Sequence, residues 1–372
     1  MKTRASILRA PHSKYETVEL DLDDPQPTEV LVKMVATGLC QSDDHVATGD
    51  IPVPMFPICG GHEGAGVVQE VGSAVRGIAP GDHVVFAFLP FCGRCRFCAR
   101  GQQNLCDDGA NLLVGSRIDD PTSFRMSLDG APVAQMAALS SFSEYTLIDM
   151  RSCVKVDPDL PLDKICLTGC CVGTGWGSAA YLADLRPGDT AIVMGIGGIG
   201  INAVQGAAHV GAQHVIAVDP IEFKREAALK VGATHAFATM DEAAELARSF
   251  TNGQGADAAV VTVGVVTGQH VAEAFAAIRK GGTVVVTAVG DITKVGIPIS
   301  AGELTLFQKR LQGALFGGCS PSVDVPRQLE MYRSGMLKLD ELVTRTYTLD
   351  EVAQGFSDLH AGVNIRGVVL FD

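Results

Sequence analysis

Four cysteines in one short run carry the strongest chemical signal in this sequence. The run CGRCRFCARGQQNLC contains Cys92, Cys95, Cys98 and Cys106. Zn–S bonds are about 2.3 Å long, and a two-residue spacer lets successive sulfurs face one point. Four thiolates leave no open coordination position, so the predicted zinc is structural and the chemistry must lie elsewhere. Free or disulfide-bonded thiols are the alternative, but disulfides suit small secreted chains, whereas this one is long and has an odd number of cysteines, 11.

A glycine-rich turn predicts a dinucleotide site. Gly195, Gly197 and Gly200 form GIGGIG directly after an apolar run and at the start of a helical pattern. The first glycine permits a tight turn, the second lets the backbone approach a pyrophosphate, and the third allows close helix–strand packing. The next strand-like run ends in Asp219, whose carboxylate can bind ribose hydroxyls and would repel a 2′-phosphate. The pattern therefore favours NAD over NADP.

Two basic residues follow Asp219 on the next helical pattern. Lys224 and Arg225 could form a solvated helix face, or one of them could reach the ribose, and Lys224 is the preferred candidate.

The elements that must position these groups change type along the chain. Up to about residue 160, short β-branched runs with turn signals predict an antiparallel, barrel-like domain, with strands at 29–38, 64–72 and 81–88. From 188 to 289, strands (190–194, 214–219, 256–263, 283–289) alternate with helices (201–211, 221–232, 268–280). This alternation predicts an α/β fold with a doubly wound parallel sheet. The tail ends in the strand-like run 365–371, which could return to the first domain.

Composition narrows the class of protein. With 372 residues, two domains are expected. A net charge of −13 repels phosphate backbones, so no nucleic-acid partner is expected. No apolar stretch suits a membrane span, and no export signal is recognised, so we expect a cytoplasmic protein without a membrane partner.

Further ligand-type residues lie in three separate segments. GLCQSDDH contains Cys40, GGHEGAG contains His62, and LTGCCVGTGWGSA contains Cys170 and Cys171. Spacing alone cannot join these segments, and an isolated cysteine or histidine is more often buried and inert.

Together the segments resemble the zinc-dependent, medium-chain alcohol dehydrogenases. The resemblance runs almost end to end, through GHEGAGVVQEVG, the four-cysteine run, GCCVGTGWGSA, the glycine turn, GALFGG and NIRGVVLF. Longer segments, such as RPGDTAIVMGIGGIGINAVQGA, resemble the actinobacterial nicotinoprotein alcohol dehydrogenases, which hold NAD(H) tightly and recycle it in place. The resemblance implies a Rossmann NAD-binding domain at 172–315 and a GroES-like catalytic domain at 1–171 and 316–372.

The resemblance also implies a second, catalytic zinc, and thus two Zn²⁺ ions per chain. Cys40, His62 and Cys170 would be its ligands, and the fourth position would be open. Asp43 would orient His62, Glu63 would be an acid near the metal, and Ser42 and His45 would relay the alcohol proton. The product would be an aldehyde or ketone, with hydride passing reversibly to NAD. The implied cofactor-binding residues are Gln41, Thr174, Gly195, Gly197, Gly198, Gly200, Asp219, Lys224 and Arg366, with Arg366 near the pyrophosphate. Phe88, Met136 and Val289 match substrate-channel positions, or are simply core residues.

Two residues depart from the family pattern. Gln41 stands where many relatives have a basic residue against the pyrophosphate, so cofactor-release behaviour does not transfer. Cys171 stands where glycine is common in the family. Its role could be that of a thiol that only resembles a ligand, an alternate metal ligand or a packing residue, and the packing role is preferred. The remaining thiols are expected to be inert, and they are Cys59, Cys153, Cys166 and Cys319.

Two other functions stay open. One is oxidation of a thiol adduct of formaldehyde, for which Arg117 and Arg125 could supply basic groups at a pocket mouth, although they could equally be surface charges. The other is a catalytically silent NAD-binding protein. The long segment between Cys106 and Cys170 resembles that of dimeric family members, so a homodimer is preferred over a tetramer, with its edge near Gly296–Ile299.

Overall fold

The computed structural model describes residues 1–372, which cluster into two compact units. The first unit contains Met1–Cys170, Ser320–Glu330 and Val343–Asp372. The second contains Cys171–Cys319 and Met331–Leu342. These limits differ from the predicted domain boundaries chiefly at residues 331–342, which cluster with the second unit although the prediction assigned them to the catalytic domain.

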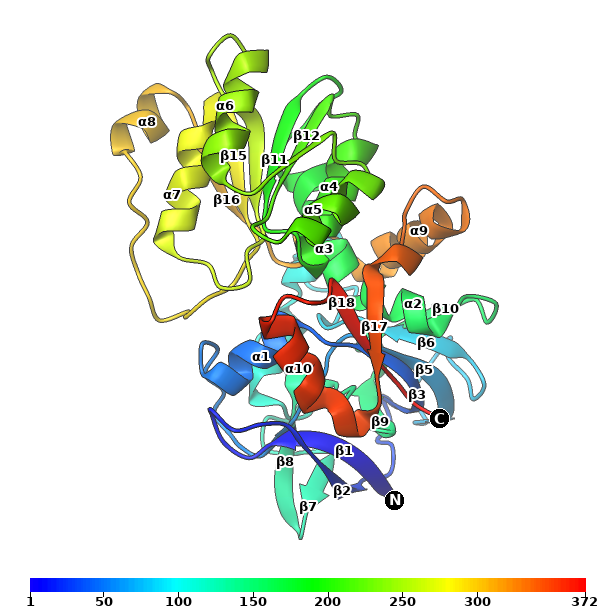
Figure 1. The fold of residues 1–372 in the computed structure, drawn as a ribbon. Helices are drawn as coiled ribbons and strands as arrows, with labels where there is room; N and C mark the ends of the chain where they lie inside the picture. The colour runs from blue at the N-terminus through cyan, green and yellow to red at the C-terminus, as the bar shows by residue number, and fades with distance from the viewer. The chain divides into compact units, whose positions relative to one another are not determined.

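The first unit is built on two sheets (Figure 1). One is a closed barrel in the order β1-β2-β7-β8-β4. Its strands are β1 Lys2–Leu8, β2 Glu16–Leu22, β4 Ile58–Cys59, β7 Met126–Leu128 and β8 Ala131–Gln135. The other has 7 strands in the order β10-β6-β5-β3-β18-β17, with β9 also paired to β3. Its strands are β3 Glu29–Gly38, β5 Gly64–Val71, β6 His83–Phe86, β9 Tyr145–Asp149, β10 Cys153–Val156, β17 Val343–Tyr347 and β18 Arg366–Leu370.

Strand β3 shows why this unit holds together. Its side chains alternate between two sides, so Val30, Val32 and Met34 enter one apolar cluster and Leu31 enters another. The C-terminal strand β18 pairs antiparallel with the end of β3, which brings the chain's tail back to the first unit. The α-helices here are α1 Gln41–Thr48, α2 Leu162–Ile165, α10 Val352–His360 and most of α9 Pro321–Arg333, whose last three residues cluster with the second unit.

The second unit is a 6-stranded parallel sheet in the order β13-β12-β11-β14-β15-β16. Its strands are β11 Thr190–Met194, β12 His214–Val218, β13 His235–Phe237, β14 Ala256–Val261, β15 Ile278–Val286 and β16 Arg310–Gly313. Its helices are α3 Cys171–Gly177, α4 Gly198–His209, α5 Glu222–Lys230, α6 Met240–Phe250, α7 Gly268–Ala277 and α8 Ala301–Leu306. Helices α6 and α7 share one apolar cluster with the sheet, and Figure 1 shows α4 and α5 on the other side. The strand–helix alternation predicted from the sequence is thus present.

Three features of this unit differ from the predicted series. The pair β13 and α6 was not predicted, because β13 has only three half-buried residues; α6 begins at a capping box between Thr239 and Glu242. The strand expected at 283–289 is β15, which ends at Val286. Residues 296–299, where the dimer edge was expected, lie in no strand of the single chain, and the last strand at that edge of the sheet is β16; the dimer edge itself stays a prediction.

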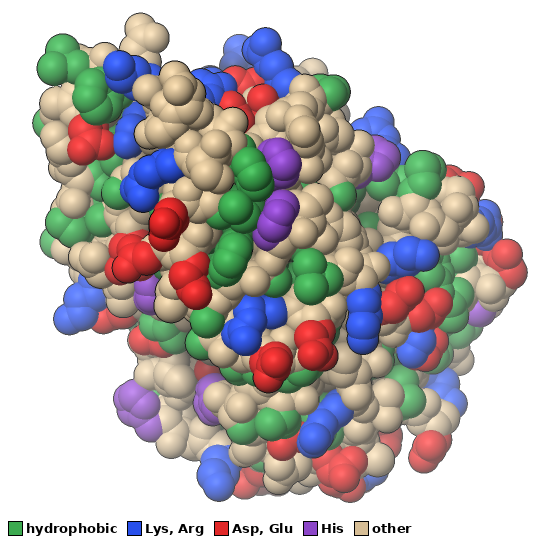
Figure 2. Space-filling view, turned by 45° about the horizontal axis from the view of Figure 1, so that its top comes forward, with side chains coloured by type: hydrophobic (Ala, Val, Ile, Leu, Met, Phe, Trp, Pro, Cys, Tyr) green, Lys and Arg blue, Asp and Glu red, His purple; other side chains and the backbone are tan.

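Charged side chains of both signs are interspersed on the face drawn in Figure 2. None of the helices has the length and apolar character that crossing a membrane requires.

Candidate functional site

Three residues from distant segments converge in the first unit. Cys40 caps the start of α1 directly after β3, His62 lies between β4 and β5, and Cys170 ends a short 3-10 helix. All three are buried, and their ligand atoms lie within 4.8 Å of one another. Two sulfurs bonded to a tetrahedral zinc at about 2.3 Å would be roughly 3.8 Å apart, so this donor set fits such an ion. Cys171 is not in the group; it is buried at the start of α3.

Close backbone approaches place these ligands. A Cβ at Gly61, which has φ +87°, would lie 2.6 Å from Phe142, and a Cβ at Gly60 would lie 2.6 Å from Tyr15. A Cβ at Gly169 would overlap the carbonyl oxygen of Phe86 in β6. The residues directly before His62 and Cys170 are therefore glycines for steric reasons.

Asp43 fixes the orientation of His62. Its Oδ2 lies 3.1 Å from His62 Nδ1, and neither atom has another hydrogen-bond partner. Its Oδ1 accepts a hydrogen bond of 2.8 Å from the Gly61 N–H, next to the histidine. Asp43 is fully buried and thus holds both the ring and the adjoining backbone, which leaves Nε2 of His62 as the ligand atom for an ion.

The charges of the group favour metal binding. Hydrogen bonding from Cys170 and the charges of His62 and Arg366 outweigh burial and hold the pKa of Cys40 well below its usual range. Burial opposes protonation of His62, but the Asp43 carboxylate and the Cys40 thiolate prevail and raise its pKa to about 10. A bound cation would take the place of that proton beside a thiolate.

The other predicted residues of this group lie close by. Ser42 Oγ is 3.8 Å from Cys40 Sγ. His45 is buried, and its Nδ1 lies 2.9 Å from Asp50 Oδ2. Glu63 forms a buried ion pair with Arg366, so Arg366 lies beside the candidate metal ligands. Gln41 donates a hydrogen bond to Asp44.

The predicted substrate-channel positions have different surroundings. Phe88 is half-buried, and its ring meets the His62 ring edge-on at 5.8 Å between centroids. Met136 belongs to a buried apolar cluster of the first unit. Val289 is half-buried and follows β15 in the second unit. Thr174, a predicted cofactor-binding residue, is buried in α3 of the same unit.

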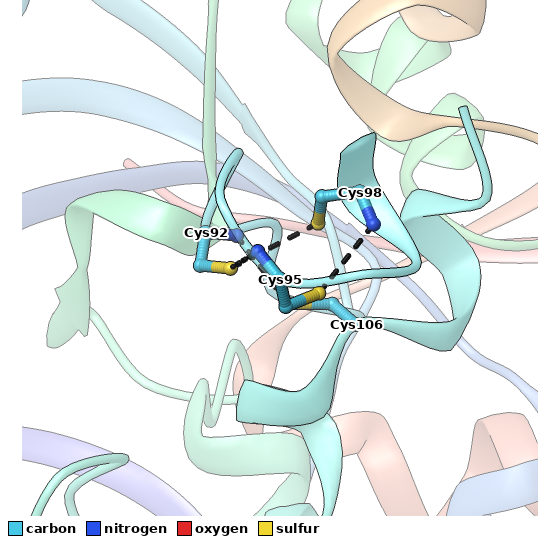
Figure 3. A group of neighbouring side chains, drawn as sticks. All are labelled: Cys92, Cys95, Cys98 and Cys106. Atoms are coloured by element: carbon cyan, nitrogen blue, oxygen red, sulfur yellow. Dashed lines mark hydrogen bonds between the residues drawn. The ribbon is translucent and has the colours of Figure 1, made fainter. Parts of the chain in front are cut away.

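The four-cysteine run forms a second candidate metal centre, with all four sulfurs within 4.8 Å of one another (Figure 3). Backbone N–H groups point at the sulfurs, from Cys95 to Cys92 at 3.3 Å and from Cys98 to Cys95 at 3.4 Å. Such hydrogen bonds, led by that from Cys98, lower the pKa of Cys95 to about 6. A closed set of four thiolates suits a structural zinc.

Arg151 ties both ends of this cysteine run to the sheet. Its carbonyl accepts a hydrogen bond of 2.9 Å from the N–H of Phe91, just before Cys92. Its guanidinium binds Asp108 at 2.7 Å, just after Cys106, and also Asp119 and Asp149. The sequence analysis missed this residue, because nothing local marks an arginine 45 positions beyond the last cysteine as its neighbour.

The glycine turn has the predicted geometry. Gly195 has φ +95°, and a Cβ at Gly200 would overlap the Gly195 carbonyl oxygen. Gly197 caps α4, Gly198 is the first residue of that helix, and the space beside Gly197 is open to 4 Å. The backbone N–H groups at the start of α4 can therefore meet a pyrophosphate.

Asp219 follows β12, is buried, and accepts hydrogen bonds from the N–H groups of Ile196 (2.8 Å) and Ile221 (2.9 Å). Its carboxylate keeps further acceptor capacity for ribose hydroxyls. Arg225, rather than the half-buried Lys224, binds the Asp219 carbonyl, at 2.8 Å.

The expectation that Arg117 and Arg125 sit at a pocket mouth is wrong. Both are buried, at 5% and 1% exposure, and both bind the buried Glu29. They neutralise a core carboxylate, so they offer no basic surface to a thiol-adduct substrate.

Comparisons with known proteins agree with this geometry. Residues 26–158 match the family model "Alcohol dehydrogenase GroES-like domain", and residues 198–333 match "Zinc-binding dehydrogenase". An NDMA-dependent alcohol dehydrogenase of Amycolatopsis methanolica is 53% identical, with 100% of this chain and 99% of that protein covered. A putative alcohol dehydrogenase D of Mycobacterium tuberculosis is 51% identical, with both chains covered fully (100%). A solved alcohol dehydrogenase zinc-binding domain protein from Burkholderia ambifaria has a TM-score of 0.92 and 30% identity, over 100% of this chain and 99% of that one.

A β-rich unit with metal-ligand clusters and a parallel sheet with a dinucleotide turn define a dehydrogenase that uses zinc and a nicotinamide cofactor. The chain belongs to the zinc-dependent medium-chain alcohol dehydrogenases. The predictions of a GroES-like unit with a Rossmann sheet, and of an oxidoreductase, are confirmed.

Proposed function

We propose that this enzyme oxidises small alcohols to aldehydes or ketones, reversibly, by hydride transfer to NAD. The observation that carries the proposal is the buried convergence of Cys40, His62 and Cys170. Three protein ligands would leave the fourth position of a tetrahedral zinc to water or substrate. The full-length similarity to proteins named alcohol dehydrogenase supports the substrate class.

The proposed metal content is two zinc ions per chain, one in the three-ligand group and one in the four-cysteine group. Zinc in the first group would act as a Lewis acid that favours the deprotonated form of an alcohol. Asp43 holds the His62 ring in place, Ser42 takes the alcohol proton, and His45, bound to Asp50, forms the outer end of the relay. Glu63 and its partner Arg366 set the charge beside the thiolates.

The proposed cofactor is NAD, because the Asp219 carboxylate suits ribose hydroxyls and repels a 2′-phosphate. The resemblance to the nicotinoprotein alcohol dehydrogenases supports a cofactor that stays bound while a second substrate regenerates it, and one similar protein is named NDMA-dependent. To test this, the protein is purified without cofactor and denatured, and NAD(H) in the supernatant is measured. Release of about one equivalent supports a resident cofactor, whereas none would favour an exchanging one.

Metal analysis and paired variants test the catalytic assignment. Wild type should contain two zinc ions, and Cys40→Ser or His62→Ala should lose one ion and alcohol turnover while keeping NAD binding. Cys95→Ser should lose the other ion and lower the melting temperature. Cys153→Ser, a change at another buried thiol, is the matched control and should keep both ions. One zinc ion in wild type, or turnover by Cys40→Ser, would refute the assignment.

We further propose a homodimer located in the cytoplasm. The outer edge of β16 has no neighbouring strand in the sheet, and residues 292–307 before it expose several large apolar side chains, including Val295 (97%) and Leu306 (81%). A second copy could pair with this edge and cover those side chains. The eleven free cysteines support a reducing compartment.

A further inference from the structure

The second unit contains two buried threonine hydroxyls, one in strand β15 and one just after it, that lack any hydrogen-bond partner. They are Thr283 Oγ1, in the part of β15 that pairs regularly with β14, and Thr287 Oγ1, one residue after that strand ends at Val286, and their residues are 2% and 6% exposed. A buried hydroxyl without a partner costs about 1–3 kcal/mol. Such a group is therefore either a tolerated defect or half of a contact that a ligand completes.

The register of the sheet separates the two threonines. Val284 and Val286 face the cluster with α6 and α7, so Thr283, Val285 and Thr287 face the opposite side. Thr283 lies toward the amino end of the parallel strands. Thr287 lies at their carboxyl end, where its N–H still bonds to the Val261 carbonyl at 3.2 Å. Ligands of open parallel sheets bind at the carboxyl end.

Thr287 also lies beside the glycine turn. Val261 pairs with Val286, so the next residues, Thr262 and Thr287, are neighbours on the same face, about 4.8 Å apart across the strands. The Thr262 hydroxyl donates to the carbonyls of Gly195 (2.5 Å) and Met194 (3.0 Å) and is thereby satisfied. Thr287, one strand further from the turn, has no such acceptor.

The order of the strands indicates which part of a bound dinucleotide would lie near the Thr287 hydroxyl. Asp219 directly follows β12, on one side of β11, and suits the adenosine ribose, while the start of α4 suits the pyrophosphate. The rest of a dinucleotide must then continue toward β14 and β15 on the other side of β11. We propose that Thr287 Oγ1 hydrogen-bonds the nicotinamide half of the bound dinucleotide. This inference rests on the proposed use of NAD.

Substitution at the two threonines tests the inference by binding alone. Valine has the shape of threonine but no hydroxyl, so Thr287→Val should speed NADH release, followed by its fluorescence, about five-fold, the equivalent of about one neutral hydrogen bond. Thr283→Val is the matched control and should release NADH like wild type. Thr287→Ser keeps the hydroxyl and should restore most of the affinity.

A truncated ligand locates the contact. AMP contains only the adenosine half, so its affinity should be the same in wild type and Thr287→Val. ADP-ribose adds the second ribose without the nicotinamide ring. Weakened NADH and ADP-ribose binding would mark a contact to that ribose, and weakened NADH binding alone would mark a contact to the ring. Either result supports the inference.

Three results would overturn the inference. The first is a rate of NADH release from Thr287→Val within two-fold of the wild-type rate. The others are a loss of AMP affinity in Thr287→Val as large as its loss of NADH affinity, and equally fast NADH release from Thr283→Val. Both valine variants should melt at or above the wild-type temperature without cofactor, because each removes an unpaired buried hydroxyl. A wild-type protein that binds no NADH would instead refute the proposed cofactor, and the inference with it.

Discussion

At the scale of single residues, Asp43 connects a ligand to its scaffold. It holds the His62 ring and the adjoining Gly61 N–H at once. We predict that Asp43→Asn weakens zinc binding at the three-ligand group about 10- to 100-fold, because the ring loses its charged partner. Competition with a chelator, read by metal analysis, measures this.

The matched control is Asp44→Asn. Asp44 is the next residue of α1 and is also buried, but its partners are Gln41 and His360. It should keep the zinc affinity of wild type. Equal zinc loss from both variants would show that α1 as a whole, rather than the Asp43 carboxylate, holds the site.

The buried pair of Glu63 and Arg366 is a second test at this scale. Both side chains are almost fully buried, at 0% and 5% exposure. Arg366→Met should lower the free energy of unfolding by about 3–5 kcal/mol, because it leaves a buried carboxylate without its cation. Urea unfolding of Arg366→Met and of the double variant with Glu63→Gln checks this. The double variant should recover part of the loss, and a double variant less stable than Arg366→Met would contradict the pairing.

The sequence predicts these residues unequally. The four cysteines lie within 15 residues, so local spacing alone indicates a closed site. Cys40, His62 and Cys170 come from three different elements, and only the family resemblance joins them. Thr287 could not be found from sequence, because a threonine in an apolar run looks like any strand residue until its hydroxyl is seen without a partner.

At the scale of elements, Arg151 lies in the turn between β9 and β10 and anchors the four-cysteine run to Asp149 of β9. Its side chain is 11% exposed and binds three carboxylates. We predict that Arg151→Ala speeds zinc release from this group to a chelator about ten-fold or more, because both ends of the run lose their attachment. Arg100→Ala, at an exposed arginine inside the run, is the control and should release zinc like wild type.

The zinc of the three-ligand group should stay bound in Arg151→Ala, since this arginine belongs to a different part of the first unit. Loss of both ions would instead indicate general unfolding. Far-UV circular dichroism of the same samples distinguishes the two results.

Strands with a clear apolar run were predicted well, and the shortest strand of the second unit was not. The structure gives β3 and β11 the predicted bounds, because both are mostly apolar runs bordered by turn residues, with Lys33 the one charged residue in the interior of β3. The three-residue β13 leaves no detectable pattern, and α6 was lost with it. The end of β15 was placed too late, because TAV continues the apolar run beyond the last ladder pair.

At the scale of the whole molecule, the exposed apolar segment next to β16 gives the proposed dimer a test. We predict that Leu306→Glu shifts the protein from dimer to monomer in light scattering, because a charge would be buried against the second copy. Met336→Glu changes an apolar side chain exposed to 59%, outside that segment, and should remain dimeric. A wild-type monomer, or a dimeric Leu306→Glu, would count against this interface.

The Asp219 carboxylate accepts hydrogen bonds from two backbone N–H groups without any ligand. These two bonds constrain any redesign of the coenzyme preference. A smaller neutral side chain would remove the repulsion that a 2′-phosphate meets, but it would also take away the acceptor for Ile196 inside the tight turn. The proposed preference for NAD and the shape of that turn thus depend on one side chain. A redesign needs a replacement acceptor, such as the amide oxygen of asparagine, together with a new cation nearby.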